Sequence, residues 1–344
     1  MKSKILKWTL LFVCLMLLIV AKLAYDVFSV NTSNIAQQGN QYIFVGSDKN
    51  YKQFLWQLNQ KNVLKNYASF ERLANVVQFN KRLKPGRYLL KPGMSNFDLF
   101  KLLASGKQSP VDLVFTGANN IEQLAALIGS QIETDSLQLM REIWSEDFLS
   151  KVQMDSANVI GLFIPNTYNF YWNTSAQECM HRMLKEYQKF WTQQRQEKAS
   201  NLGLNQKQVS ILASIVQKES NLYKEMPLIA GVYLNRINKG MPLQADPTLL
   251  FIANDPERKR VTADLIAMDS PYNTYLNTGL PQGPICCPSV QAIDAVLNAS
   301  KTLNYYFCAA PDFSGKHIFA KTLQQHTINA QNYRRALNKM GVFR

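Results

Sequence analysis

The acidic residue Glu219 stands at the end of an apolar stretch that has the spacing of a buried helix. The apolar residues recur three and four positions apart, as on one face of a helix: Val209, Leu212, Ala213, Ile215 and Val216. Where such a helix meets the surface, burial raises the pKa of a carboxyl group and makes it usable as a general acid. The alternative is a surface glutamate on the last helical turn, which this stretch alone favours.

Caps and chain breakers outline the elements that would position Glu219. Asn205 followed by Gln208 is a capping box, which predicts that the helix begins there. Downstream, polar residues beside Pro and Gly indicate loops of the kind that line binding sites: Leu243–Thr248, Ser270–Tyr275 and Gly279–Ile285. Structural interpretations compete with this one. Asp246-Pro247 is typical of a helix N-cap followed by a first-turn proline, and Tyr272–Tyr275 is typical of a tight turn.

The polar residue types favour carbohydrate chemistry. Amide, hydroxyl and aromatic side chains accompany isolated carboxylates, and the sequence has no nucleophile motif, P-loop or dinucleotide fingerprint. His317 and His326 lie too far apart, with too few other ligands, to indicate zinc, so we interpret them as satisfied structural histidines and expect neither metal nor cofactor. The cysteines favour buried free thiols, with a bridge from Cys286 or Cys287 to Cys308 as the alternative.

The start of the chain predicts a membrane anchor. Lys2, Lys4 and Lys7 precede an apolar run that, extended to Tyr25, reaches the roughly 20 residues that a span needs. Because Lys22 and Leu23 interrupt any small-x-small cleavage site, we interpret residues 1–30 as an uncleaved signal anchor with its basic end in the cytoplasm. The formal charge of +14 suits an anionic partner, and the external placement argues against nucleic acid.

The rest of the 344-residue chain predicts an α+β fold in two parts. Residues 31–40 are polar and indicate a tether. Residues 41–108 would form a small unit with a strand at 42–45, helices around 54–58 and 70–77, a strand at 87–90, and a helix capped by Ser95 that stops at Gly106.

Residues 109–344 would form the larger part. We expect a strand at 111–115 and helices at 121–128, 137–148 and 180–191. The aromatic residues of 161–172 would form either a core hairpin or a wall of sugar-binding faces, and core packing is favoured.

Several motifs in fixed order resemble one known family, the endolytic murein transglycosylases (MltG, YceG-like). They are Leu212–Ser220, Tyr233–Arg236, Leu243–Thr248, Pro271–Tyr275 and Gly279–Ile285, supported by Arg87-Tyr88, Lys91–Met94, Phe163–Tyr168, Tyr305–Phe307, His317–Phe319 and His326. Each motif is weak by itself, and their order makes the resemblance specific. It covers nearly the whole chain, from the anchor to about Tyr333.

The resemblance implies a single-pass inner-membrane protein with its catalytic part in the periplasm or on the outer face of the cell. Residues 41–108 would be a LysM-like subdomain and residues 109–344 the catalytic domain. The implied reaction cleaves the β-1,4 bond between N-acetylmuramic acid and N-acetylglucosamine within glycan strands and leaves a 1,6-anhydro end. Implied partners are peptidoglycan strands, the membrane and peptidoglycan synthases, and not nucleic acid.

Glu219 matches the catalytic glutamate of that family and would act first as acid and then as base. Substrate-binding roles are implied for Gln244, Asp246, Tyr272, Asn273 and Thr274. Because the nucleophile would be the substrate's own C6 hydroxyl, a second catalytic acid is not needed. The alternatives are a hydrolase that admits water, an anchored murein-binding scaffold without catalysis and, more remotely, a DNA-binding membrane protein.

Overall fold

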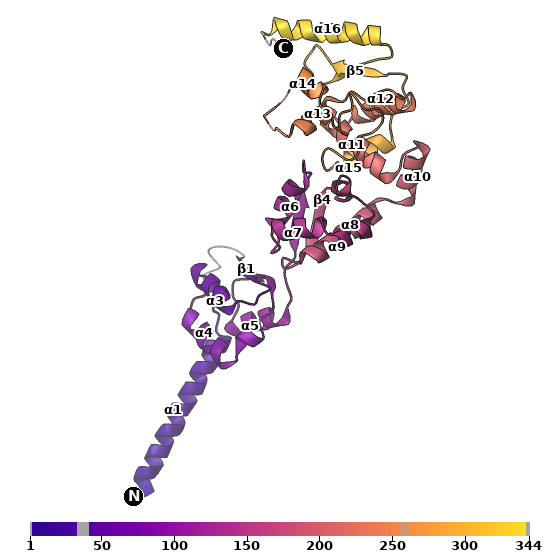
Figure 1. Cartoon of the computed structure of the whole chain (residues 1–344). Coiled ribbons are helices and arrows are strands. Elements are labelled where there is room, and N and C mark those ends of the chain that lie inside the picture. The colour runs from indigo at the N-terminus through magenta and orange to yellow at the C-terminus, as the bar shows by residue number, and fades with distance from the viewer. Residues whose placement is uncertain (1, 33–40, 256, 259, 342–344) are drawn as a thin grey trace. The chain divides into compact units, whose positions relative to one another are not determined.

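The computed structural model describes residues 2–32, 41–255, 257–258 and 260–341, which fold as a mixture of helices and small sheets (Figure 1). The chain divides into two compact units. The first unit comprises Met1–Leu113, Gln131–Thr134 and Asn169–Ser175, and the second comprises Val114–Ser130, Asp135–Tyr168 and Ala176–Arg344. The domain boundaries expected from sequence, 41–108 and 109–344, stay a prediction.

The first helix, α1 (Lys2–Phe28), is long and apolar enough to cross a membrane. Its last turns are joined to the folded part of the first unit. Asp26 is buried, and its carboxylate accepts a hydrogen bond from Arg72 at 3.2 Å. The fully buried Asn96 donates through Nδ2 to the Asp26 carbonyl at 2.8 Å and accepts through Oδ1 from Asn31 Nδ2 at 2.6 Å. The end of α1 is therefore part of a packed core.

The predicted tether begins with two residues that the structure places in this core. Asn31 and Thr32 are buried, and the Thr32 hydroxyl donates to the carbonyl of Lys91 at 2.8 Å. Their side chains and backbone are used to attach the chain to the loop before Asn96. Residues 33–40 of the predicted tether lie outside the described residues.

The first unit has the strand, helix, helix, strand order that the sequence predicts. The elements are β1 (Gln41–Val45), α3 (Tyr51–Gln60), α4 (Tyr67–Val76), a 3-10 turn (Phe79–Lys81) and β2 (Gly86–Leu90), followed by α5 (Asn96–Ser105). β1 and β2 pair antiparallel with Ile43 opposite Tyr88, and both side chains enter one apolar core. Ser95 caps α5 in a capping box with Asp98, and the helix ends at the left-handed Gly106, as predicted.

The next segment leads from β3 (Val111–Phe115) through α6 (Ile121–Gly129), α7 (Ser136–Ile143), α8 (Glu146–Val152) and a 3-10 turn (Val159–Leu162) to β4 (Asn166–Phe170) and α9 (Ala176–Phe190). β3 pairs with β4. The predicted single helix at 137–148 is wrong, because the Ser145 hydroxyl accepts from the Phe148 N–H and starts a new helix. The aromatic segment packs as core: Phe163, Tyr168 and Phe170 are buried.

The second unit is built around α11 (Gln206–Glu219), in which every residue from Val209 to Val216 is buried. α11 packs against α10, α12, α13 and α15. The remaining elements of the second unit are α10 (Gln193–Asn201), α12 (Met226–Asn238), α13 (Asp246–Ala253), α14 (Ala263–Ile266), α15 (Val290–Leu297), β5 (Tyr306–Ala309), β6 (His317–Ala320) and α16 (Leu323–Lys339). Because these helices pack around α11, its last residue, Glu219, is held in a fixed position.

The cysteines are free thiols. Cys179, Cys286 and Cys287 are buried, Cys308 is partly buried and Cys14 is exposed on α1. The alternative of a bridge to Cys308 is therefore wrong. Burial raises the pKa of Cys179 to about 12, so this thiol stays protonated and behaves as a small apolar side chain.

Candidate active site

Glu219 is the last residue of α11 and opens into a cavity of about 500 Å³. The predicted capping box is present at the other end of the helix, where Asn205 and Gln208 satisfy each other's backbone N–H groups. α11 ends at Glu219 because Ser220 is extended, with φ of −145°. The Glu219 side chain is only partly exposed, and the hydroxyl of the buried Tyr233 in α12 donates to its Oε1 at 2.5 Å.

Burial raises the pKa of Glu219 to about 7, and this is the largest influence on that carboxyl. The hydrogen bond from Tyr233 acts in the opposite direction because it stabilises the charged form, whereas the negative charge of Asp246 raises the pKa further. The balance leaves a substantial fraction of Glu219 protonated near neutral pH. A carboxyl group in this state can donate a proton and, once charged, can take one back.

Asp246 lines the same cavity as Glu219. It lies in the first turn of α13, and its carboxylate accepts a short hydrogen bond from the Tyr275 hydroxyl. The N-cap of α13 is Ala245, so the interpretation of Asp246 as the cap is wrong, while the first-turn position of Pro247 is confirmed. The Asp246 side chain contacts Tyr275 and the cavity instead of the helix N-terminus.

Gln244 also reaches the cavity, and a buried arginine holds the loop around it. Gln244 has a left-handed backbone, with φ of 48°, and its N–H donates to the Thr274 carbonyl at 2.9 Å. Arg236 from α12 donates to the carbonyls of Leu243 at 2.8 Å and Tyr305 at 2.7 Å and to Oε1 of Gln244 at 3.3 Å. One guanidinium therefore joins the loop before α13 to the segment entering β5.

The structure gives Asn273 and Thr274 internal partners. Asn273 is fully buried, and its Nδ2 donates to the carbonyls of Ile266 at 3.0 Å and Met268 at 2.8 Å. The Thr274 hydroxyl is buried as well, accepts from the Ala245 N–H at 3.0 Å and bonds the Thr248 hydroxyl at 2.9 Å. Buried polar atoms that already have partners hold the loop in place and are not exposed to a ligand.

Tyr272 does not line the cavity of Glu219. Its ring packs on Phe251 with centroids 4.8 Å apart, and its hydroxyl lies so near Gly283 that an added Cβ there would be 2.8 Å away. Of the predicted site residues, the structure brings Gln244 and Asp246 into one cavity with Glu219 and places Tyr272, Asn273 and Thr274 elsewhere in the surrounding loops.

The far wall of the cavity comes from β5, β6 and α16. This wall is lined by Tyr305, Tyr306 and Phe307 and by two histidines that are distant from Glu219 in the sequence, His317 and His326. His317 is satisfied, since both its backbone N–H and its Nδ1 lie 3.0 Å from the Glu225 carboxylate.

His326 stacks on Tyr306 with ring centroids 5.3 Å apart. Its Nδ1 is buried without a hydrogen-bond partner among the described residues, so the prediction of a satisfied histidine is wrong at this atom. Burial lowers the pKa of His326, and the charge of Arg236 lowers it further.

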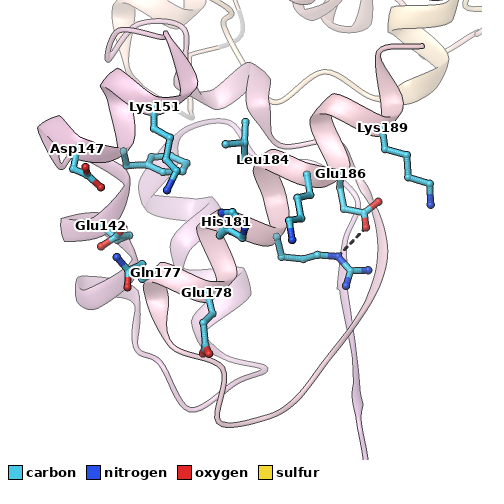
Figure 2. A pocket seen from close by; sticks show the side chains of 12 residues that line it. Glu142, Asp147, Lys151, Gln177, Glu178, His181, Leu184, Glu186 and Lys189 are labelled. Carbon is cyan, nitrogen blue, oxygen red and sulfur yellow. Dashed lines mark hydrogen bonds and ion pairs between the residues drawn. The ribbon is translucent and has the colours of Figure 1, made fainter.

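A separate cavity of about 470 Å³ lies on α7, α8 and α9 of the same unit. Figure 2 shows that charged side chains line it, including Glu142, Asp147, Lys151 and Lys189. It contains none of the predicted site residues. The dashed line in Figure 2 marks the ion pair between Arg182 and Glu186, whose atoms lie 2.8 Å apart.

The cavity around Glu219 defines a class of site. A carboxyl group with a pKa near neutrality, a second carboxylate and a wall of tyrosine and phenylalanine rings in one concavity suit acid–base chemistry on a polar substrate with flat faces. The sequence model of the YceG-like family matches residues 43–332, and the chain belongs to this family. The resemblance inferred from the ordered motifs is thereby confirmed.

Two relatives agree with the assignment to the YceG-like family, and one solved structure shares the fold. The chain is 28% identical over 264 residues to the endolytic murein transglycosylase of Bacillus subtilis strain 168, covering 72% of each protein. It is 29% identical over 336 residues to that of Streptococcus pneumoniae D39, covering 87% of this chain and 60% of the relative. A crystal structure of a YceG-like protein from Listeria monocytogenes shares the fold, with a TM-score of 0.55 and 24% identity over 84% of this chain and 98% of the other.

Proposed function

We propose that the protein is a membrane-anchored endolytic lytic transglycosylase. It would cleave the β-1,4 bond between N-acetylmuramic acid and N-acetylglucosamine within murein strands and leave 1,6-anhydro ends. The names of the relatives support the reaction class. The observation that carries the proposal is the position of Glu219: a carboxyl with a pKa of about 7 at the rigid end of a buried helix, open to a cavity with aromatic walls.

In the first step, protonated Glu219 donates its proton to the glycosidic oxygen, and the bond from C1 to that oxygen breaks through an oxocarbenium-like state. In the second step, the Glu219 carboxylate takes the proton of the muramyl C6 hydroxyl while O6 forms the new bond to C1. No water is consumed. The Tyr233 hydroxyl, at 2.5 Å from Oε1, would stabilise the carboxylate between the two steps.

Asp246 and Gln244 are the side chains that we propose contact the sugars. The negative charge of Asp246 lines the same cavity and would stabilise positive charge developing at C1. Thr274 would position Gln244 directly and Asp246 through Ala245, because it bonds the backbone N–H groups of Gln244 and Ala245. Asn273 would hold the loop that carries Thr274, through its bonds to the carbonyls of Ile266 and Met268. Tyr272 would support the surrounding loops from outside the cavity, through its contacts with Phe251 and Gly283.

The rest of the chain would place this site at the cell wall. α1 would anchor the protein in the cell membrane with its basic end inside and the catalytic unit on the outer or periplasmic side. The strand, helix, helix, strand part would be a LysM-like subdomain that contacts murein. Peptidoglycan synthases are candidate partners, because a synthase supplies the nascent strand that this reaction shortens.

Digestion of purified murein, with products resolved by mass spectrometry, tests the proposal. We expect anhydro-muramic ends from the full-length protein in detergent and none from Glu219→Gln. Glu186→Gln, which removes a carboxyl from the ion pair with Arg182, is the matched control and should cleave normally. Reducing muramic ends would instead identify a hydrolase, which the second carboxylate Asp246 in the same cavity would favour.

The absence of cleavage by a folded wild-type protein that still binds murein would support the scaffold alternative. Circular dichroism of each variant shows whether the fold is retained. Binding of murein to Glu219→Gln, measured by co-sedimentation, separates a loss of chemistry from a loss of substrate.

A further inference from the structure

A second cavity is lined by the same two helices, α11 and α13, that contribute Glu219 and Asp246 to the first. It measures about 520 Å³, and two of its lining residues, Lys218 and Pro247, are direct sequence neighbours of residues that line the first cavity. Glu219 and Asp246 line the first cavity, whereas their sequence neighbours Lys218 and Pro247 line the second. The end of α11 and the start of α13 therefore stand between two hollows, with the reactive carboxyl at the division.

The second cavity has amide side chains whose oxygen atoms already have partners. Asn119 Oδ1 accepts from Lys218 Nζ at 2.7 Å, Asn120 Oδ1 from the Gln123 N–H at 2.8 Å, and Gln123 Oε1 from the Asn119 N–H at 2.7 Å. Because all three donors are N–H groups, the atoms that accept must be the amide oxygens. The remaining NH₂ groups of these three side chains make no hydrogen bond to any described residue, and all three side chains are exposed.

The cavity thus offers several N–H donors beside an apolar surface, which is formed by Pro247, Leu250, Phe251 and Ile285. Asn254, Asp255 and Arg258 complete its lining, and the Arg258 guanidinium is paired with Asp264. The amide donors and the apolar surface together suit an acetamido group, whose carbonyl accepts hydrogen bonds and whose methyl is apolar. A plain hydroxyl has no methyl to bury against the apolar surface.

We propose that this second cavity is a binding subsite for the N-acetyl groups of the glycan strand, on the opposite side of Glu219 from the aromatic cavity. The inference rests on the proposed function and adds to it. A strand seated in both hollows has sugars on each side of the bond that Glu219 protonates, which is the geometry of cleavage inside a strand.

The amide donors can be removed without disturbing the contacts that hold them. Asn119→Asp keeps an oxygen for Lys218, and Asn120→Asp keeps the cap of α6, since aspartate is as good an N-cap as asparagine. Asn298→Asp is the control outside both cavities: Asn298 Oδ1 also accepts from a lysine, Lys198 Nζ at 2.6 Å. Because Asn298 Nδ2 also donates to the Asp294 carbonyl at 2.6 Å, circular dichroism must show that this variant keeps its fold.

Binding is measured on full-length Glu219→Gln in detergent by calorimetry with two neutral β-1,4 hexasaccharides. Chitohexaose carries an acetamido group on each sugar, and cellohexaose carries a hydroxyl in its place. We expect the double substitution Asn119→Asp with Asn120→Asp to weaken chitohexaose binding about tenfold, to leave cellohexaose binding unchanged, and the control to change neither. Saturation-transfer NMR should show weaker contact at the acetyl methyl groups.

Chitohexaose affinity within about twofold of the parent would overturn the subsite while leaving the proposed function standing, because a lost donor to a bound carbonyl costs more than that. An equal loss of affinity for both hexasaccharides would also overturn it, since the cavity would then not distinguish an acetamido group from a hydroxyl. Failure of Glu219→Gln to bind either sugar or murein would overturn the proposed function itself, and the subsite with it.

Discussion

The hydroxyl of Tyr233 donates to Oε1 of Glu219 at 2.5 Å, although the two residues are fourteen positions apart and lie on different helices. The contact opposes the effect of burial: it favours the carboxylate, whereas desolvation favours the acid. Tyr233 is almost fully buried, so its ring is held rigidly and its hydroxyl has a fixed direction. The proton affinity of Glu219 is therefore set by a neighbouring helix as well as by its own.

Replacing Tyr233 by Phe should move the pH dependence of cleavage upward. Loss of the hydroxyl destabilises the charged form, so the pKa of Glu219 and the alkaline limb of kcat rise by about one unit. We also expect cleavage at neutral pH to fall about tenfold, because the carboxylate formed in the first step loses its donor. Release of anhydro-muropeptides from pH 5 to 9 measures both effects. Tyr187→Phe, which removes a hydroxyl bonded to Gln206 at a distance from the cavity, is the control.

Replacing Asp246 by Asn should move the same limb in the opposite direction. The charge of Asp246 raises the pKa of Glu219, so a neutral amide lets Glu219 ionise at lower pH and reduces the acid form at pH 7. The other groups that line this cavity and titrate or carry charge are Tyr233, Arg236, Tyr275, Tyr305, Tyr306, Cys308, His317, His326 and Tyr333, and all of them remain. An unchanged or upward-shifted profile from a folded Asp246→Asn protein would contradict this coupling.

The stability of the protein should depend on Glu219 in a pH window set by its pKa. The folded-state pKa is raised from 4.5 to about 7, so the folded protein binds more protons than the unfolded chain between these values. Stability therefore falls as pH rises through that window. Glu219→Gln cannot ionise, and we expect it to be more stable than wild type by about 3 kcal/mol at pH 8 and by about 1 kcal/mol at pH 5.

Thermal unfolding followed by circular dichroism at the two pH values tests this expectation. Glu186→Gln serves as the comparison, because it removes a carboxyl from the ion pair with Arg182 outside the cavity. A Tm difference for Glu219→Gln that is the same at pH 5 and pH 8 would show that burial does not perturb this carboxyl.

A fourth prediction concerns the end of α1. Asn96 is fully buried and bonds Asp26, Asn31 and the Ser69 hydroxyl through both ends of its amide. Asn96→Leu would leave these partners unsatisfied in the core and should destabilise the first unit by about 2–4 kcal/mol. Limited proteolysis should then cut near residues 29–32 faster than in wild type, while the melting of the second unit stays unchanged. Asn59→Leu, at an exposed position in α3, is the control.

Local signals account for the parts of the fold that the sequence predicted well. The capping box at Asn205, the buried face of α11 and the stop at Gly106 each depend on residues within one or two turns. The helix break at Ser145 was equally local and could have been found, because a serine followed by two acidic residues is a common helix start.

The partners of the site depend on tertiary contacts that no spacing reveals. Tyr233 and Tyr275 occur in motifs noted from the sequence, yet nothing in their spacing connects them to Glu219 and Asp246. The polar residues of 272–274 looked suited to a ligand, and two of them turned out to be occupied by backbone groups. The sequence shows which side chains can form hydrogen bonds, but only the fold shows which of them are already bonded to other protein groups.

The bond network around Asn96 gives α1 a mechanical role. Because Asp26 and Asn31 are both hydrogen-bonded to Asn96, the end of α1 is connected rigidly to the folded part of the first unit. The orientation of α1, wherever that helix is held, therefore also sets the tilt and rotation of the folded part of the first unit. A change in the inclination of this helix would be transmitted as a turn of the first unit.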